Sequence, residues 1–493
     1  MPEELARPAD MFDREYEWSA LSRYVADTGA GATLGVVSGR RRQGKSFLLE
    51  SLCEAAGGFY FAATEATERE SLRRLGEEVG AFLRSPHPIT YPDWETAIDS
   101  LLSLGSEGPT PVVIDEFPYL CRATPALPSI VQRAFGPRRS ARHESRTRLL
   151  LCGSAVSFMG SLLAGSAPLR GRASLDLTVA PFDYRTAARF WGADDERLAV
   201  QLHAVVGGTP AYRREFVRDD APTGIADFDS WLTRTVLDPA SPLFKEARYL
   251  LAEEPDLRDR ALYYSVLAAI AEGNTTRGRI ASYIGRAADT LSHPLTMLED
   301  VGFIVRVPDA FHPARTTFRI AEPVVTFYHA IMRPEWGRLE RPGAAATVWA
   351  DNRSRFRSLV LGPHFEHLAR SWVSHHCAAT TLGARPTWVR PGVLNEPKTR
   401  SSMEIDVVAV RADGEQRKRL LALGEAKWGT ELELGHLDRL TTALELAAAR
   451  GFDAAQARLM LFSGAGFTAP LIERATADDR VELIDLTRLY SGV

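Results

Sequence analysis

The chain has 493 residues, of which 45% are apolar and 25% charged, and its formal net charge is −4. This length predicts about three domains of roughly 150 residues each, and the near-neutral charge excludes a polycation, so any nucleic-acid contact must come from local patches. The four cysteines lie far apart, which argues against a zinc site. The absence of an apolar leader and of any run approaching about 20 apolar residues favours a soluble cytoplasmic protein with no membrane partner.

Short apolar runs alternate with helical patterns in the first part of the chain. Buried strands are expected at residues 33–38, 58–62, 111–117 and 149–153, and helices at residues 47–56 and 68–83. Strands that alternate with helices predict a parallel sheet in an α/β domain. Residues 182–255 follow a mostly helical pattern, which suits a helical lid on the first domain. We therefore expect the first domain to span residues 1–255.

A glycine-rich loop lies between the first predicted strand and the helix after it. Its sequence, GRRRQGKS, fits the G-x-x-x-x-G-K-S pattern, in which backbone N–H groups hold phosphates at a helix N-terminus. Lys45 would reach the β- and γ-phosphates, and Ser46 would give its hydroxyl to magnesium. The residues expected to bind ATP are Gly39, Arg40, Arg41, Arg42, Gln43, Gly44, Lys45 and Ser46.

Polar residues after two later strands are candidates for ATP hydrolysis. Asp115 and Glu116 end the third predicted strand, where Asp115 would hold Mg²⁺ through water and Glu116 would polarise the attacking water. Ser154 follows the fourth strand, where it would sense the γ-phosphate or cap the next helix. Arg170 and Arg172 would stabilise transition-state charge, or they are ordinary surface arginines. A homo-oligomer would follow if either arginine acts across a subunit boundary.

The sequence pattern of residues 256–335 differs from that of the first domain. Helical patterns at 261–271, 279–284 and 290–300 precede a predicted hairpin at 302–307 and 316–320, which is the order of a winged helix-turn-helix. A linker is expected at residues 333–344. The domain would contact DNA, or it would act only as a lever between domains.

Three sets of polar residues are candidates for nucleic-acid contacts. The predicted contacts on the helices are Arg277, Arg279, Arg286, Thr290 and Ser292. The predicted phosphate contacts on the hairpin are Arg306, Arg315 and Arg319. A basic stretch before the fourth strand is either a solvated surface or a patch that follows a nucleic-acid strand. Its members are Arg133, Arg138, Arg139, Arg142, Arg146 and Arg148.

Residues 345–493 are expected to form a third, α/β domain. A helix at 364–375 precedes strands at 404–410 and 420–426, and the second strand leads into Glu425 and Lys427, which are two residues apart and share a face. Asp406 on the neighbouring strand would join them. Two carboxylates and a lysine would hold Mg²⁺ or Mn²⁺ and orient a metal-bound water against a phosphodiester. The alternative is a salt-bridged cluster without activity.

These motifs together resemble a known family. The segments FDREYEW, GRRRQGKS, VVIDEFPYL, LCGSAVSFM, PLRGRA and GGTPAY look like the archaeal-type P-loop ATPases of the AAA-related and STAND-related group. In that family a winged helix and a further C-terminal domain follow the ATPase. Asp13 stands where the family usually has glycine, and Gln43 where a small apolar residue is common. The D…ExK pattern resembles the restriction-endonuclease-like PD-(D/E)xK superfamily, in which Glu366 matches a helix carboxylate.

Two functions from different classes remain open at this point. The first is an ATP-regulated, metal-dependent nuclease that acts on DNA. The second is a nucleotide-switched signalling or scaffolding ATPase whose C-terminal domain only binds nucleic acid or a protein partner. The complete carboxylate–lysine set favours the first function, and the near-neutral charge of residues 256–335 favours the second.

Overall fold

The computed structural model describes residues 5–254, 257, 259–396, 401–412 and 418–492. The chain divides into two compact units: Met1–Pro181 with Asp300–Gly302, and Phe182–Glu299 with Phe303–Val493. Within the described ranges, no helix combines the length and the apolar composition needed to cross a membrane.

The first unit contains the predicted parallel sheet. Its strands are β1 (Thr33–Ser38), β2 (Phe59–Ala62), β3 (Thr110–Asp115), β4 (Thr147–Gly153) and β5 (Ala173–Thr178), in the order β2-β3-β4-β1-β5 with all pairs parallel. The four predicted strands are confirmed. Strand β5 was not predicted, because it lies at the sheet edge and only one of its six residues is buried.

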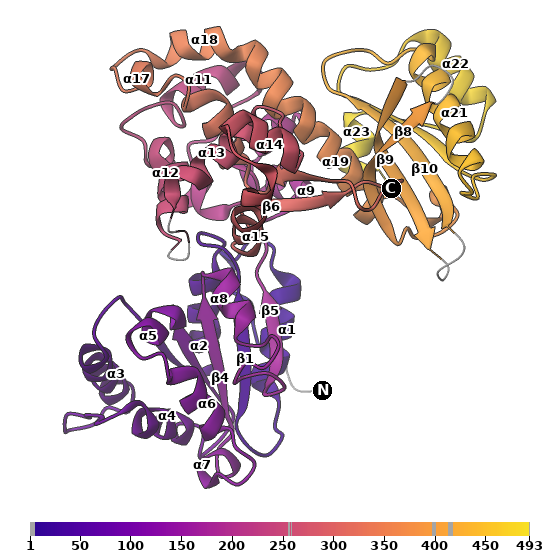
Figure 1. The fold of residues 1–493 in the computed structure, drawn as a ribbon. Coiled ribbons are helices and arrows are strands. Elements are labelled where there is room, and N and C mark those ends of the chain that lie inside the picture. The colour runs from indigo at the N-terminus through magenta and orange to yellow at the C-terminus, as the bar shows by residue number, and fades with distance from the viewer. Residues whose placement is uncertain (1–4, 255–256, 258, 397–400, 413–417, 493) are drawn as a thin grey trace. The chain divides into compact units, whose positions relative to one another are not determined.

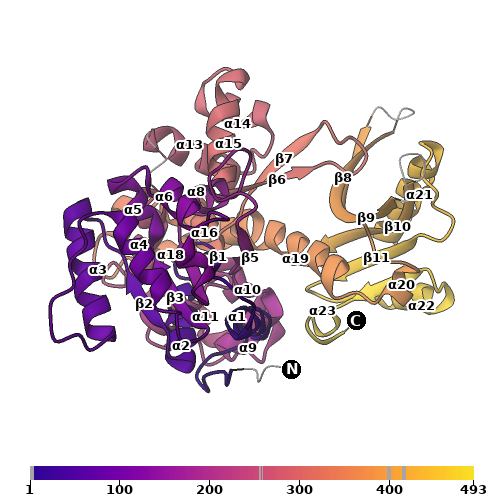
Figure 2. The ribbon, with the colours of Figure 1, turned by 90° about the horizontal axis from the view of Figure 1, so that it is seen from below.

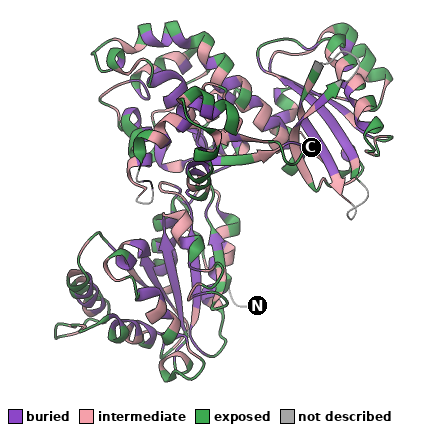
Figure 3. Cartoon of the chain, viewed as in Figure 1, coloured by how far each residue is buried: buried purple, intermediate pink, exposed green. Residues whose placement is uncertain are grey.

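Helices cover both faces of this sheet (Figure 1). They are α1 (Glu15–Ala26), α2 (Lys45–Ala56), α3 (Glu68–Phe82), α4 (Trp94–Ser103), α5 (Phe117–Ala123), α6 (Leu127–Ala134), α7 (Ser140–His143) and α8 (Val156–Ser161). Neighbouring strand residues point to opposite faces, so Val36 belongs to the core beneath α3 to α6 while Val37 belongs to the core beneath α1 and α2. The central strands are accordingly buried on both faces (Figure 3).

The basic stretch before β4 does not form one solvated surface or patch. Arg148 is 0% exposed, and its guanidinium donates hydrogen bonds to the carbonyl oxygens of Gly31 (2.8 Å), Gly29 (2.9 Å) and Asp27 (3.1 Å). Arg139 lies 3.6 Å from Asp99. Arg148 is therefore a structural residue that satisfies backbone carbonyls, as a buried cation requires.

The second unit begins with helices and continues with a hairpin. Its first elements are α9 (Tyr184–Trp191), α10 (Glu196–Val206), η1 (Tyr212–Phe216), η2 (Ile225–Asp227), α11 (Phe228–Arg234), α12 (Pro242–Ala252), α13 (Arg260–Ala271), α14 (Arg277–Ile284), η3 (Ala288–Leu291), α15 (Ser292–Asp300), β6 (Ile304–Pro308) and β7 (Thr316–Ile320). Three helices and an antiparallel hairpin thus occur in the order expected for a winged helix. The last helix begins at Ser292 rather than at 290, because a 3₁₀ turn precedes it.

The tip of this hairpin packs on the C-terminal part of the unit. Ala310 belongs to the apolar core of the C-terminal sheet, and its N–H donates to the carbonyl oxygen of Pro391 at 2.9 Å. Phe311 packs edge to face against Phe452. Asp309 accepts a hydrogen bond from the N–H of Val393 at 3.0 Å. The tip therefore makes contacts within the unit. This favours the interpretation in which this part of the domain acts as a lever and does not contact DNA.

Two expected boundaries differ from the structure. Residues 182–255 were grouped with the first domain but belong to the second unit: the Tyr184 hydroxyl donates to the Leu489 carbonyl at 2.9 Å, and ring nitrogens of His203 and His364 lie 2.9 Å apart. The expected linker at 333–344 is packed instead, since Leu339 is fully buried and the ring of Trp336 lies 4.6 Å from that of Phe244.

The remaining elements carry a five-stranded mixed sheet. They are α16 (Pro323–Phe327), η4 (Tyr328–Met332), α17 (Trp336–Leu339), α18 (Ala345–Arg355), η5 (Phe356–Leu361), α19 (Gly362–His375), α20 (Ala379–Leu382), β8 (Trp388–Glu396), β9 (Ser401–Ala412), β10 (Lys418–Lys427), α21 (Leu434–Ala449), β11 (Arg458–Ser463), α22 (Ala469–Ala477), β12 (Val481–Ile484) and α23 (Leu486–Ser491). The strand order is β12-β11-β10-β9-β8, with β8, β9 and β10 antiparallel and β10, β11 and β12 parallel. Figures 1 and 2 show α19 on one side of this sheet and α21 on the other.

Candidate functional sites

The glycine-rich loop of the first unit joins β1 to α2. Gly39 and Gly44 have φ angles of 150° and 83°, and a Cβ on Gly39 would lie 2.4 Å from the Val179 carbonyl oxygen, so this turn requires glycine. Lys45 begins α2, and its Nζ donates to the carbonyl oxygen of Arg40 at 2.8 Å. Burial lowers the pKa of Lys45, because desolvation disfavours its charged form.

Ser46 and Asp115 meet at the end of the sheet. The Ser46 Oγ and the Tyr60 hydroxyl each donate to Oδ2 of Asp115 at 2.7 Å. Burial by itself would raise the pKa of Asp115, but hydrogen bonds from Cys152, Ser46 and Tyr60 hold that pKa below its usual value. The carboxylate is therefore ionised beside the hydroxyl that the motif assigns to magnesium. These residues fit a Mg²⁺ ion bound together with ATP phosphates.

Glu116 and Ser154 form the second half of this site. Glu116 has a φ of 51°, a strained value for this residue type, and Oγ of Ser154 donates to both of its carboxylate oxygens at 2.8 and 3.0 Å. Ser154 does not cap α8, whose N-cap is Ala155 without a side-chain bond. The structure thus brings Ser154 to Glu116, the acid expected to orient water.

Other expected residues of the first unit lie outside this cluster. Arg170 and Arg172 are exposed, and Arg170 donates to the Gly165 carbonyl of its own loop. Gln43 is 1% exposed, and its carbonyl oxygen accepts from Arg14 at 3.1 Å. Asp13 has a φ of 57°, which explains why a glycine would suit its place. The roles of Arg170 and Arg172 remain predictions.

Sequence reasoning missed Tyr60 as a partner of Asp115. Tyr60 lies on β2, which pairs in parallel with β3, and its hydroxyl reaches Asp115 across that pair. The apolar pattern of β2 indicates a strand but not its neighbour, so no sequence signal identified this contact.

The carboxylates and the lysine of the C-terminal sheet do lie together. Nζ of Lys427 is 2.7 Å from Oε1 of Glu425 and 3.3 Å from Oδ2 of Asp406. Oδ2 of Asp406 also accepts the backbone N–H of Ala426 at 2.9 Å. Arg439 of α21, which the sequence did not single out, donates to Oε1 of Glu425 at 3.2 Å and to the Glu404 carbonyl at 2.6 Å. Two cations therefore neutralise the buried Glu425.

The chemistry of this cluster allows a weakly held divalent cation. Within the described residues, no group of three or more His, Cys, Asp or Glu side chains is placed to hold a metal. Oε2 of Glu425 is nevertheless buried without a hydrogen-bond partner, and such an oxygen is a donor that a cation would satisfy. Magnesium commonly takes one or two carboxylates and keeps several waters, so Asp406 and Glu425 fit that ion.

Glu366 faces this cluster from α19. It shares with Asp406, Glu404 and Arg370 the wall of a cavity of about 600 Å³. Arg370 donates to the Asp406 carbonyl at 2.8 Å. The same cavity is lined by arginines near the hairpin, namely Arg279, Arg315 and Arg319. One cavity thus connects the expected helix carboxylate with residues predicted to contact DNA.

The titration of Glu366 gives a test of this placement. Burial, and then repulsion from Asp406, raise the pKa of Glu366 from 4.5 to about 7. Between these values the folded chain keeps a proton that the unfolded chain has lost, so stability falls as pH rises from 4.5 to about 7. We expect Glu366→Gln to remove this loss and to stabilise metal-free protein at pH 8 by about 1–3 kcal/mol. Denaturant unfolding at pH 5 and pH 8 measures the free energy of unfolding of both proteins. The same pH dependence of this free energy in the variant and in wild type would contradict the expectation.

The expected DNA contacts on the helices are all exposed: Arg277, Arg279, Arg286, Thr290 and Ser292. Arg277 donates to Oγ of Ser292 at 3.1 Å, which joins two of them on one surface. On the hairpin, Arg306 pairs with Glu299 at 3.0 Å. Arg319 is half-buried on the wall of the cavity, and burial lowers its pKa to about 10.

Comparisons with known proteins give distant similarities. No protein-family model matches the chain. An uncharacterized protein of Methanocaldococcus jannaschii is 25% identical over 332 residues, which are 66% of this chain and 70% of that protein. Among solved structures, the chain is similar to a Walker-type ATPase of Pyrococcus abyssi, at 22% identity and a TM-score of 0.49 over 66% of this chain and 98% of that one. It is also similar to the ORC2 protein of Aeropyrum pernix, at 15% identity and a TM-score of 0.41 over 71% and 98%. The function of the chain is therefore inferred from the geometry of its own sites.

Proposed function

We propose that the first unit binds ATP with Mg²⁺ and hydrolyses it. The observation that carries this proposal is the 2.7 Å hydrogen bond between Ser46 of the glycine-rich loop and Asp115 at the end of β3. P-loop enzymes hold a nucleotide and its metal with a serine or threonine hydroxyl, an aspartate carboxylate and a lysine. Ser46, Asp115 and the buried Lys45 are residues of these types.

Each residue of the site has a separate task in this proposal. The N–H groups of residues 39–46 and the Lys45 ammonium would hold the phosphates. Asp115 and Ser46 would hold a Mg²⁺ ion, which supplies positive charge beside the transferred phosphoryl group when it is bound. Glu116 accepts hydrogen bonds from the attacking water, while Ser154 keeps its carboxylate in place.

Replacing Glu116 with Gln tests the hydrolytic step separately from binding. The variant should retain ATP affinity, because Glu116 touches no phosphate in this scheme, and should slow hydrolysis by about 100-fold or more, because the amide is a poor base. Phosphate release and ATP binding measure the two properties. Glu144→Gln, at an exposed position, is the matched control and should match wild type. Unchanged turnover in Glu116→Gln would assign the role to another residue.

For the C-terminal sheet we propose metal-dependent cleavage of DNA, regulated by the nucleotide state of the first unit. The observation in favour is the cluster of Asp406, Glu425 and Lys427, with Glu366 on the same cavity as Asp406. Mg²⁺ or Mn²⁺ would lower the pKa of a bound water there. Asp406 and Glu425 would hold the ion, and Lys427 would orient the nucleophile.

DNA would reach this cluster along exposed surface near the hairpin. Arg279 and Arg315 are exposed at the wall of the cavity that contains Glu366 and Asp406, and they suit contacts with phosphates. The second candidate function, a nucleotide-switched protein whose C-terminal sheet only binds DNA or a protein, is favoured by the two cations on Glu425 and by the packed tip of the hairpin. Cleavage assays separate the two functions.

A further inference from the structure

Two cations bind the same oxygen of Glu425. Its side chain is 0% exposed, and Oε1 lies 2.7 Å from Nζ of Lys427 and 3.2 Å from Nη1 of Arg439. In the described part of the chain, Oε2 of this carboxylate is buried without a hydrogen-bond partner. With Asp406, which lies 3.3 Å from Lys427, the cluster holds two carboxylates and two cations. Its net charge is therefore zero without a metal, although one carboxylate oxygen still lacks a partner.

Arg439 reaches Glu425 from α21, whose Leu437 belongs to the same apolar core as Leu423 of β10. The side chain of Arg439 is 39% exposed. Its Nη2 donates to the carbonyl oxygen of Glu404 at 2.6 Å, so the guanidinium keeps a backbone partner if Nη1 leaves Glu425. A guanidinium has five N–H groups, so these two contacts leave others for an anion in solvent.

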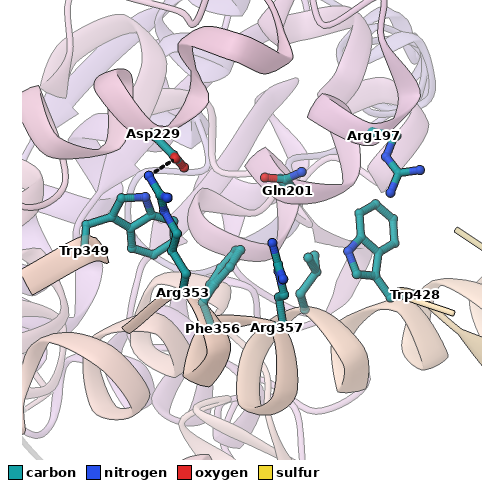
Figure 4. Close-up of a pocket in the computed structure, with 10 residues that line it drawn as sticks. Arg197, Gln201, Asp229, Trp349, Arg353, Phe356, Arg357 and Trp428 are labelled. Carbon is teal, nitrogen blue, oxygen red and sulfur yellow. Dashed lines mark ion pairs between the residues drawn. The ribbon is translucent and has the colours of Figure 1, made fainter. Parts of the chain in front are cut away.

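The end of β10 is held by contacts that do not involve α21. Trp428, which follows Lys427, is 8% exposed, and the Arg197 guanidinium lies 5.4 Å from the centroid of its ring (Figure 4). Arg197 also donates to the Gly464 carbonyl at 2.7 Å, and the Gly464 N–H donates to the Lys427 carbonyl at 3.0 Å. Lys427 contacts both carboxylates, whereas Arg439 contacts only one, at a longer distance. Arg439 is therefore the cation that can leave the cluster at lower cost.

A divalent ion would disturb the charge balance of this cluster. An ion beside Asp406 and Glu425 would leave two excess positive charges, and the two cations would repel it. A phosphate group of DNA carries one negative charge, so its arrival lowers this excess. A guanidinium also binds phosphate through paired, charge-assisted hydrogen bonds. The metal ion and DNA should therefore strengthen each other's binding at this cluster.

We propose that Arg439 makes metal binding at this cluster conditional on bound DNA. Without DNA, Arg439 neutralises Glu425 and opposes the ion. When a DNA phosphate is present, Nη1 of Arg439 turns to it, Nη2 keeps the Glu404 carbonyl, and Glu425 is released to the ion. The contact thus keeps the cluster from holding a metal until the substrate has arrived. This inference rests on the metal-dependent function proposed above for the C-terminal sheet.

The test measures Mn²⁺ binding to the full chain without ATP, from the electron paramagnetic resonance signal of free Mn²⁺. Binding that Asp406→Ala removes belongs to the C-terminal cluster. Without DNA, Arg439→Gln should bind Mn²⁺ at least about tenfold tighter than wild type, because one opposing charge is gone. A saturating short DNA duplex should tighten Mn²⁺ binding at least about tenfold in wild type and less than about threefold in Arg439→Gln. Arg474→Gln, which removes an exposed arginine on α22, should match wild type in both measurements.

The outcomes separate this inference from the proposed nuclease function. Metal-dependent cleavage by wild type, with Mn²⁺ affinity and its response to DNA unchanged in Arg439→Gln, would overturn the role of Arg439 and leave the nuclease proposal standing. No Mn²⁺ binding by wild type, with or without DNA, would overturn both. If Arg439→Gln fails to fold, wild type alone decides, and equal Mn²⁺ affinity with and without DNA would overturn the inference.

Discussion

Lys45→Ala should weaken ATP binding by at least about 100-fold, equivalent to about 2.7 kcal/mol, and should abolish hydrolysis. Lys45 is 6% exposed, and its Nζ donates a hydrogen bond to the Arg40 carbonyl oxygen of the loop. Bound phosphates would replace this carbonyl as the partner of the ammonium group. The alanine keeps α2 intact, since it is a strong helix former. Fluorescent-nucleotide titration and phosphate release measure the two effects.

The matched control for this change is Lys245→Ala, at an exposed position on α12. It removes the same charge from the chain and should bind ATP as wild type does. Both variants should unfold at temperatures close to wild type. Wild-type affinity in Lys45→Ala would refute the assignment of the loop as the ATP site.

Asp406→Ala should eliminate DNA cleavage and leave ATP hydrolysis unchanged, because the two clusters occupy separate units of the chain. The change removes one of two proposed metal ligands and also one of the two carboxylate partners of Lys427. We expect a loss of at least about 100-fold, the scale on which positioned catalytic groups act. Cleavage of supercoiled plasmid in Mn²⁺ measures it, with Asp438→Ala on the exposed side of α21 as control.

Lys427→Ala separates chemistry from metal binding at the same cluster. It should also eliminate cleavage, but it should strengthen Mn²⁺ binding, because the lysine competes with the ion for Glu425 and Asp406. Cleavage that persists in both variants would show that this cluster is not the cutting site.

The first sheet and its loop could be predicted because local sequence determines them. Residues 33–38 are apolar and lead directly into glycines, so the strand, the loop and α2 follow from neighbouring residues. The pairing of Glu425 with Lys427 was equally local, since alternate strand residues share a face. Strands β11 and β12 were missed, because residues 458–463 and 481–484 are short apolar runs that periodicity does not distinguish from helix.

Contacts between distant segments could not be predicted. Arg439 reaches Glu425 only because α21 crosses the sheet, and the packed tip at Ala310 depends on how the hairpin meets β8. The sequence pattern predicts Arg148 as one of a run of surface arginines. Its burial depends on the loop of residues 27–31, which is distant in sequence and whose carbonyl oxygens accept its hydrogen bonds. The grouping of residues 182–255 failed for the same reason, since helical periodicity shows that helices form but not what they pack against.

One assay tests most directly whether this chain is an ATP-regulated, metal-dependent nuclease. Purified protein is incubated with supercoiled plasmid and with single-stranded DNA, each with and without ATP and Mn²⁺, and the products are separated on a gel. We predict cleavage that requires Mn²⁺, changes with ATP in wild type, and no longer responds to ATP in Lys45→Ala. Tight DNA binding without cleavage in every combination would contradict this account and would leave the C-terminal sheet as a binding module.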